Sequence, residues 1–233
     1  MAAKDKKVLY ISQEIYPYLP ESDLAHVARY LPEHIQSAGH DVRIFMPRYG
    51  LVNERRNQLH EVIRLSGINV IVDDYDHPLV IKVASIPSTR IQVYFIDNPD
   101  LFGRKSLFEP ASKGAPSDNA DRSIFFIRGV LEAIKSLHWI PDLIHCLGWF
   151  SALAPVYLKT AYKDDPYFER AKVIFSIDGN EEEGEVGDDL IKKLEFDKIR
   201  GDMLAPLQGE VTPDALRRMA IHYSDGVILG QER

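Results

Sequence analysis

The stretch from residue 143 to residue 158, LIHCLGWFSALAPVYL, constrains the fold more than any other segment. It carries no charged residue, contains Gly148 and Pro155, and at 16 residues is too short to span a membrane. We therefore interpret it as a buried strand from Leu143 to Cys146, a Gly-Trp turn, and a helix over 149–162 kinked at Pro155. Because ligands bind beyond the carboxyl ends of parallel strands, the turn is a candidate site.

The N-terminal region has the strand–helix–strand pattern of a parallel sheet. Val8 to Ile11 is a short apolar strand, residues 24–38 carry apolar side chains at spacings of three and four, and residues 41–46 are again strand-like. We expect Asp23 to cap the start of the helix and Gly39 to end it in a left-handed conformation.

The rest of the chain continues this alternation. We expect a β-meander insertion over residues 60–97, a helix over 118–137, a strand over 172–177, a solvated acidic loop over 178–189, a helix over 213–223 capped by Thr212, and a strand over 226–229. This order predicts a Rossmann-like α/β fold, a doubly wound parallel sheet in a single domain spanning 1–233. Since the chain stops soon after a strand, we expect a C-terminal portion to be absent.

Composition excludes several classes of function. The net charge of −7 argues against nucleic acid as a partner, and no segment is suited to span a membrane. Val8 to Ile11 is too short for a signal-peptide core, and the single cysteine, Cys146, allows no internal disulfide, so we expect a cytoplasmic protein. The loop after the first strand, SQEIYPYLPESD, has no glycine, and neither a Walker A motif nor a zinc spacing occurs. We therefore expect no cofactor and no metal.

The N-terminal segment KKVLYISQEIYPYLPESDLAHVARYLPEHIQSAGHDVRIFMPRYG resembles that of bacterial glycogen synthases and plant starch synthases, family 5 glycosyltransferases with the two-domain GT-B architecture. VYFIDNPDLF, DNADRSIFFIRGVLEAI, PDLIHCLGWFSALAPVYLK and KVIFSIDGN are similar, in the same order, to further family segments. The resemblance implies the N-terminal half of a GT-B enzyme. It also implies the family reaction, transfer of glucose from ADP-glucose to an α-1,4-glucan with retention of configuration.

The departures from the family pattern concern the catalytic and donor-binding residues. Family members have K-T-G-G-L where residues 20–24 are PESDL, H-D-W-H where residues 147–150 are LGWF, and His-Asn where residues 178–179 are Asp-Gly. In GT-B enzymes the C-terminal domain, absent here, carries most of the nucleotide-sugar site. We therefore assign no catalytic residue and expect a divergent member that is not catalytic alone.

The candidate substrate site is a cleft at the carboxyl edge of the sheet, lined by Glu14, Tyr16, His145, Trp149 and Asp178 and able to bind an α-glucan or maltooligosaccharide. Each residue also has a structural interpretation: a solvated acid for Glu14, core packing for Tyr16 and Trp149, a strand histidine for His145, and the start of the acidic loop for Asp178. Two alternatives stay open, an acceptor-side half of a split glycosyltransferase and an interaction module without sugar binding. The protein partner would be a separate C-terminal domain or a second copy in a homodimer.

Overall fold

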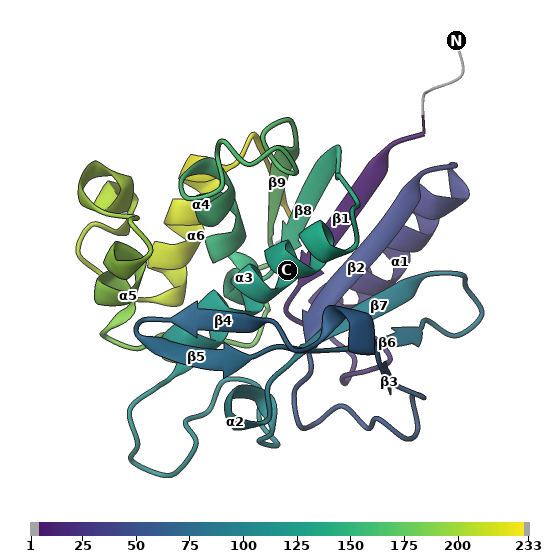
Figure 1. The fold of residues 1–233 in the computed structure, drawn as a ribbon, viewed down its shortest axis with the longest axis horizontal. Helices are drawn as coiled ribbons and strands as arrows, with labels where there is room; N and C mark the ends of the chain where they lie inside the picture. The colour runs from purple at the N-terminus through teal and green to yellow at the C-terminus, as the bar shows by residue number, and fades with distance from the viewer. Residues whose placement is uncertain (1–4, 231–233) are drawn as a thin grey trace.

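The computed structural model describes residues 5–230, in which eight strands form one sheet and two form a separate hairpin (Figure 1). The sheet order is β10-β9-β8-β1-β2-β7-β6-β3, and every neighbouring pair from β10 to β7 is parallel. The strands are β1 (Lys7–Ser12), β2 (Asp41–Pro47), β3 (His60–Glu61), β4 (Asn69–Val72), β5 (Tyr75–Pro78), β6 (Val80–Ser85), β7 (Gln92–Asp97), β8 (Leu143–Leu147), β9 (Lys172–Ile177) and β10 (Gly226–Leu229).

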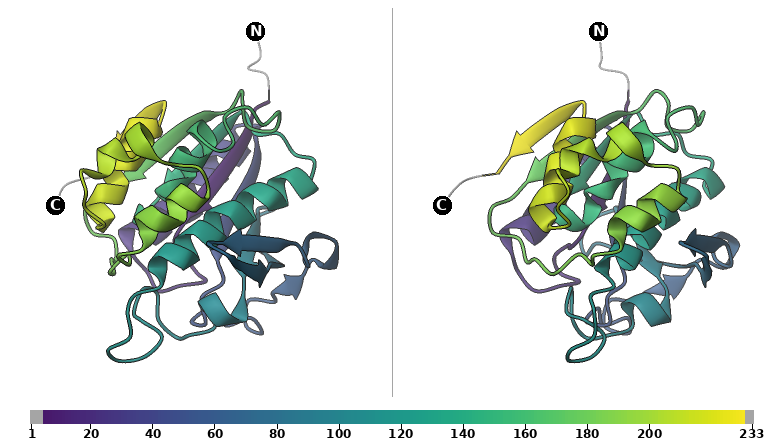
Figure 2. Two further views of the ribbon diagram at one scale, coloured as in Figure 1. Left: turned by 60° about the vertical axis from the view of Figure 1, so that its left-hand side comes forward. Right: turned by 90° about the vertical axis from the view of Figure 1, so that its left-hand side faces the viewer.

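Helices cover both faces of the sheet, which confirms the predicted doubly wound α/β fold. Figures 1 and 2 show α1 on one face and α3, α4 and α6 on the other, as right-handed crossovers on the two sides of β1 require. The helices are α1 (Asp23–Ser37), α2 (Pro99–Phe102), α3 (Asn119–Ser136), α4 (Leu153–Lys159), α5 (Leu190–Phe196) and α6 (Pro213–Tyr223), with 3₁₀ turns η1 (Ile63–Leu65), η2 (Trp149–Ser151) and η3 (Gly201–Leu207). Of the helices within 5–230, none is long and apolar enough to cross a membrane.

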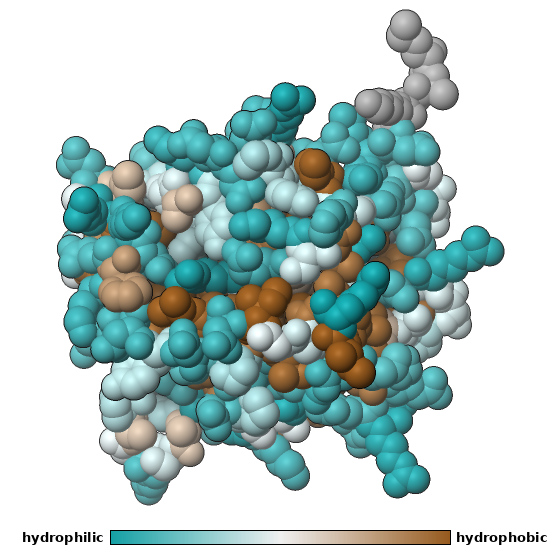
Figure 3. Space-filling view, viewed as in Figure 1, coloured by the Kyte–Doolittle hydropathy of each residue, from teal (hydrophilic) through white to brown (hydrophobic). Residues whose placement is uncertain are grey.

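The segment predicted as a meander divides into two parts. β3, β6 and β7 pair antiparallel, and β4 and β5 form the separate hairpin, as a meander requires. β7, however, also pairs parallel with β2, so residues 92–97 belong to the central sheet rather than to an insertion. Figure 3 shows apolar side chains gathered over the hairpin and the adjoining η1, where Ile63 is 82% and Ile71 42% exposed.

Two helix boundaries differ from the prediction. The N-cap of α1 is Ser22 rather than Asp23, because the Ser22 hydroxyl accepts the Ala25 N–H at 2.9 Å. The predicted helix over 149–162 is a 3₁₀ turn followed by a short α4. Pro155 lies in the first turn of α4, where its missing N–H needs no partner, so it starts the helix rather than kinking it.

Candidate functional site

A cleft of about 480 Å³ opens beyond the carboxyl ends of β1 and β9. Its walls come from the loops after these strands, from the loop before α1 and from the segment after α2. Its charge is strongly one-sided: the charged residues among the described ones that line it are Glu14, Glu21, Glu109, Glu181, Glu182 and Lys105. The cleft thus offers many hydrogen-bond acceptors and little positive charge.

Glu14 is a predicted site residue that lines this cleft. It is 4% exposed, and the Ser22 hydroxyl donates to its carboxylate at 2.8 Å. Burial raises the pKa of Glu14, the Ser22 hydrogen bond lowers it, and the carboxylates of Glu182 and Asp178 raise it further. A carboxylate in this environment favours neutral hydrogen-bond donors and disfavours anions.

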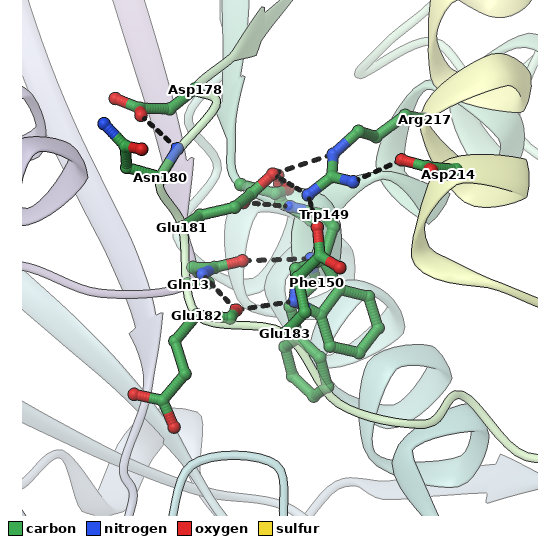
Figure 4. A network of polar contacts seen from close by, with 12 residues as sticks. Gln13, Trp149, Phe150, Asp178, Asn180, Glu181, Glu182, Glu183, Asp214 and Arg217 are labelled. Carbon is green, nitrogen blue, oxygen red and sulfur yellow. Dashed lines mark hydrogen bonds and ion pairs between the residues drawn. The ribbon is translucent and has the colours of Figure 1, made fainter. Parts of the chain in front are cut away.

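Residues 178–189, here called the acidic strap, connect β9 to α5 and cross the mouth of the sheet. The Glu181 side chain is only 1% exposed. Its carboxylate accepts the Trp149 backbone N–H at 2.7 Å and the Arg217 Nε–H at 2.8 Å (Figure 4). The prediction that this segment is solvated throughout is therefore wrong, because Arg217 on α6 supplies a counter-charge that allows Glu181 to be buried.

The strap is attached at further points along its length. Arg217 also pairs with Glu183 and Asp214, while the Asn119 amide and the Ser117 hydroxyl donate to the Glu185 carbonyl at 2.7 and 2.5 Å. Gly184 lies so close to the segment after α2 that a Cβ there would be 2.4 Å from the Phe108 Cβ. The strap is therefore also held at Glu183, Gly184 and Glu185.

The pKa of the Glu181 carboxyl is shifted from its usual value. Burial raises the pKa of its carboxyl to about 7, while Arg217 and the Trp149 N–H lower it and Glu183 raises it. Burial outweighs the counter-charge, so the carboxyl takes up a proton near neutral pH.

Trp149 is fully buried beneath the strap. Its indole N–H donates to the Glu182 carbonyl at 2.9 Å, and its ring centroid lies 4.8 Å from that of Phe108 and 5.5 Å from that of Phe150. In this arrangement the ring packs on the core and does not reach the cleft. Contact between Trp149 and a sugar stays a prediction that requires the strap to move.

His145 lies within the sheet rather than in the cleft. Its ring is 5.3 Å from that of Tyr10 on β1, and its Nε2 is 2.6 Å from the Ser176 hydroxyl on β9. Burial lowers the pKa of His145 to about 4, so the imidazole is neutral at neutral pH. The Ser176 side chain thus provides the hydrogen-bond partner of the His145 ring.

The other two predicted residues lie beside the cleft. Tyr16 is half-buried and stacks on His26 of α1 with ring centroids 5.1 Å apart. Asp178 begins the strap, where its carboxylate accepts the Asn180 N–H at 3.0 Å, and it is close enough to Glu14 to raise that residue's pKa. The carboxylates of Asp178 and Glu14 are thus close enough to repel each other, whereas Tyr16 lies to the side of the cleft against α1.

Gln13 and Gly148 are site residues that sequence reasoning missed. The Gln13 side chain accepts the Phe150 N–H at 3.2 Å and donates to the Glu182 carbonyl at 3.4 Å. Gly148 has φ +86°, and a Cβ there would lie 2.3 Å from Gln13 Oε1. Their positions in the sequence could have identified them, because both residues directly follow strands that are adjacent at the switch point of the sheet.

Arg122 was also missed, and it fixes one wall of the cleft. It is fully buried on α3, and donates to the carbonyls of Leu101 and Leu107 at 2.8 and 2.7 Å. Leu107 and its neighbour Lys105 line the cleft. Burial lowers the pKa of Arg122 to about 10, which leaves it charged at neutral pH.

A second, larger cavity of about 970 Å³ lies on the other side of the strap, between the first turn of α3 and the start of α6. Its carboxylates are largely paired: Asp118 with Arg104, Asp121 with Lys193, and Glu183 with Arg217. No cluster of three or more His, Cys, Asp or Glu within residues 5–230 is arranged to hold a metal ion.

Comparisons with known proteins agree with this architecture. The family profile described as "Starch synthase catalytic domain" matches residues 7–229. A glycogen synthase of Chlorobium luteolum is 37% identical over 86% of this chain and 41% of its own length, and one of Chlorobaculum tepidum is 40% identical over 76% and 36%. The catalytic domain of starch synthase IV from Arabidopsis thaliana, solved bound to ADP and acarbose, superposes with a TM-score of 0.78 at 22% identity, covering 96% of this chain and 44% of that one.

The chain spans about two fifths of the length of these curated relatives. The matched region nonetheless includes nearly all of the described residues, from the start of β1 to the end of β10. The chain therefore belongs to the starch synthase catalytic domain family.

Proposed function

We propose that the chain is a divergent glycogen or starch synthase domain that binds an α-glucan in the 480 Å³ cleft and does not transfer glucose from ADP-glucose on its own. The observation that carries this proposal is the charge of the cleft, whose walls set five glutamates against Lys105. Glu21 and Ser22, from the segment that stands where the family has K-T-G-G-L, are among the lining residues.

Electrostatics separates the two candidate ligands. Two like unit charges 4 Å apart repel by about 4 kcal/mol at an effective dielectric constant near 20, so a diphosphate among these carboxylates is strongly disfavoured. A glucan has no charge, and its hydroxyl groups donate to carboxylate oxygens. We propose that Glu14 accepts such a hydrogen bond and that Asp178 contributes at the edge of the cleft.

Calorimetric titration tests this proposal. We expect saturable binding of maltoheptaose, no binding of ADP-glucose, and affinity reduced by about tenfold or more in Glu14→Gln, since a hydrogen bond to a charged group contributes about 1.5–3 kcal/mol. Glu210→Gln is the matched control, because Glu210 pairs with Arg218 away from the cleft. Failure to bind millimolar maltoheptaose, or binding of ADP-glucose in its place, would overturn the proposal and favour an interaction module.

A second candidate function is the acceptor-side half of a glycosyltransferase whose other half is a separate polypeptide. It is favoured by the apolar surface of β10, where Val227, Ile228 and Leu229 are 39%, 46% and 75% exposed. An exposed apolar edge strand fits a polypeptide partner. Co-purification with such a partner, and glucosyl transfer only after mixing, would support it; a homodimer through β10 would argue for self-association instead.

We place the protein in the cytoplasm, in keeping with its single, buried cysteine.

A further inference from the structure

The acidic strap satisfies a group of hydrogen-bond donors at the mouth of the sheet. These donors come from three separate elements: the Gln13 amide after β1, the backbone and indole N–H groups of Trp149 after β8, and the Arg217 guanidinium on α6. Their acceptors are the Glu181 carboxylate and the Glu182 carbonyl, two adjacent positions of the strap (Figure 4). Without the strap, these donors would face open space and require other oxygen acceptors.

The strap also divides the space above the sheet. Glu181 and Glu182 line the 480 Å³ cleft, and the following residues, from Glu183 to Asp189, line the 970 Å³ cavity. The strap is therefore the wall between them, and its displacement would join the two into one groove that passes over Trp149.

The negative charge of the strap makes its contact with Arg217 important. The strap carries seven acidic residues out of twelve, and Glu182 lies close enough to Glu14 to raise that residue's pKa. Arg217 opposes this repulsion by pairing with both Glu181 and Glu183. Removal of Arg217 would take away this counter-charge and the guanidinium donors that hold the Glu181 carboxyl, which favours exposure of that carboxyl to solvent.

We propose that the strap is an internal ligand: its oxygen atoms occupy the donors of Gln13, Trp149 and Arg217, and a glucan takes their place when the Glu181–Arg217 contact opens. The site uncovered would be a second part of the glucan-binding surface, with donors where the cleft has acceptors. The identity of the incoming ligand rests on the proposed function above, whereas the opening of the strap does not.

Tryptophan fluorescence tests the opening directly, because the chain has two tryptophans and Trp139→Phe leaves Trp149 as the only one. In that background we would compare acrylamide quenching in Arg217→Met and Arg218→Met. Both replacements keep an apolar stem on α6, but Arg218 contacts Glu210 and the Leu207 carbonyl rather than the strap. We expect a several-fold rise in the quenching constant for Arg217→Met and no change for Arg218→Met.

Glu181→Gln provides a second route to the same answer if Arg217→Met fails to fold. It keeps the shape of the side chain and removes the ion pair, so we expect intermediate quenching. Unchanged quenching in the folded Arg217 and Glu181 variants would overturn the proposal.

Maltoheptaose titration of the same proteins tests the exchange of ligands. Tighter binding by Glu181→Gln, which removes the ion pair but keeps the Arg217 donors, than by the Arg218→Met control is the expected result. If the parent protein binds maltoheptaose and the opened variant binds it no more tightly, the strap is not an internal ligand. If quenching rises but no protein binds the glucan, the proposed function fails while the opening of the strap stands.

Discussion

The pKa of Glu181 leads to a quantitative prediction about stability. Its carboxyl takes up a proton near pH 7 in the folded protein and near 4.5 when unperturbed. The folded state therefore binds this proton more tightly than the unfolded state, so the contribution of Glu181 to stability is greatest below pH 4.5 and declines as the pH rises to 7. The difference of about 2.5 units corresponds to roughly 3 kcal/mol, since each unit is worth 1.36 kcal/mol.

Other groups titrate in the same range, so the measurement needs a subtraction. Burial raises the pKa of Glu14, which adds a trend of the same sign, and burial lowers the pKa of His145 from 6.5 to about 4, which adds one of opposite sign. Glu181→Gln removes one titration, keeps the shape of the side chain and leaves the other groups in place.

Urea unfolding of the parent protein and of Glu181→Gln would be followed at several pH values from 4.5 to 8. We expect the parent protein to lose about 3 kcal/mol relative to the variant as the pH rises through this window, by the linkage above. Above pH 8 the difference should be constant. A difference that is flat, or that grows in favour of the parent protein with rising pH, would refute the assignment of a burial-raised pKa to Glu181 and indicate that Arg217 dominates.

The remaining predictions concern the core beneath the site. Gly148→Ala should lower the free energy of unfolding by at least about 1–2 kcal/mol more than Gly67→Ala, because the two glycines share φ +86° but only Gly148 would bring a Cβ against Gln13; equal losses in chemical denaturation would contradict this steric argument. Cys146 is fully buried, and burial raises the pKa of its thiol, so it should react with a thiol reagent only when the protein unfolds; rapid labelling of the native protein would be inconsistent with the buried position.

Local patterns predicted most of the helices and strands because their signals are local. The spacing of apolar residues in α1, the Thr212-Pro213 start of α6 and the apolar run of β9 each depend on neighbours in sequence. The N-cap of α1 was displaced by one residue because Ser22 and Asp23 are both good caps, and only the backbone geometry selects between them. Helix α5 and turn η3, between 190 and 207, were not predicted.

The candidate site was less predictable because its contacts join distant parts of the chain. Glu14 could be placed by its position after β1, whereas the burial of Glu181 depends on Arg217, which is 36 residues away in sequence. From its composition alone, the acidic segment 178–189 is predicted to be a solvated loop. Nothing in the neighbouring sequence shows that one of its carboxylates has a counter-charge. Trp149 was predicted to line the cleft, but it is buried beneath the strap, which was not foreseen.

The contacts that hold the fold are largely separate from the charges that line the cleft. The sheet and α3 are held by apolar packing and by Arg122, whose partners are backbone carbonyls and the amide oxygen of Asn119. None of these partners is charged, so none of them requires a counter-charge among the residues of the cleft. Substitutions that change the charge of residues 20–24 would therefore leave these core contacts in place. The strap is the exception, because Glu181 contacts both Trp149 of the core and Arg217 of α6. A change in ligand that requires the strap to move would thus alter stability and binding together, and this coupling is what the Arg217 and Glu181 variants measure.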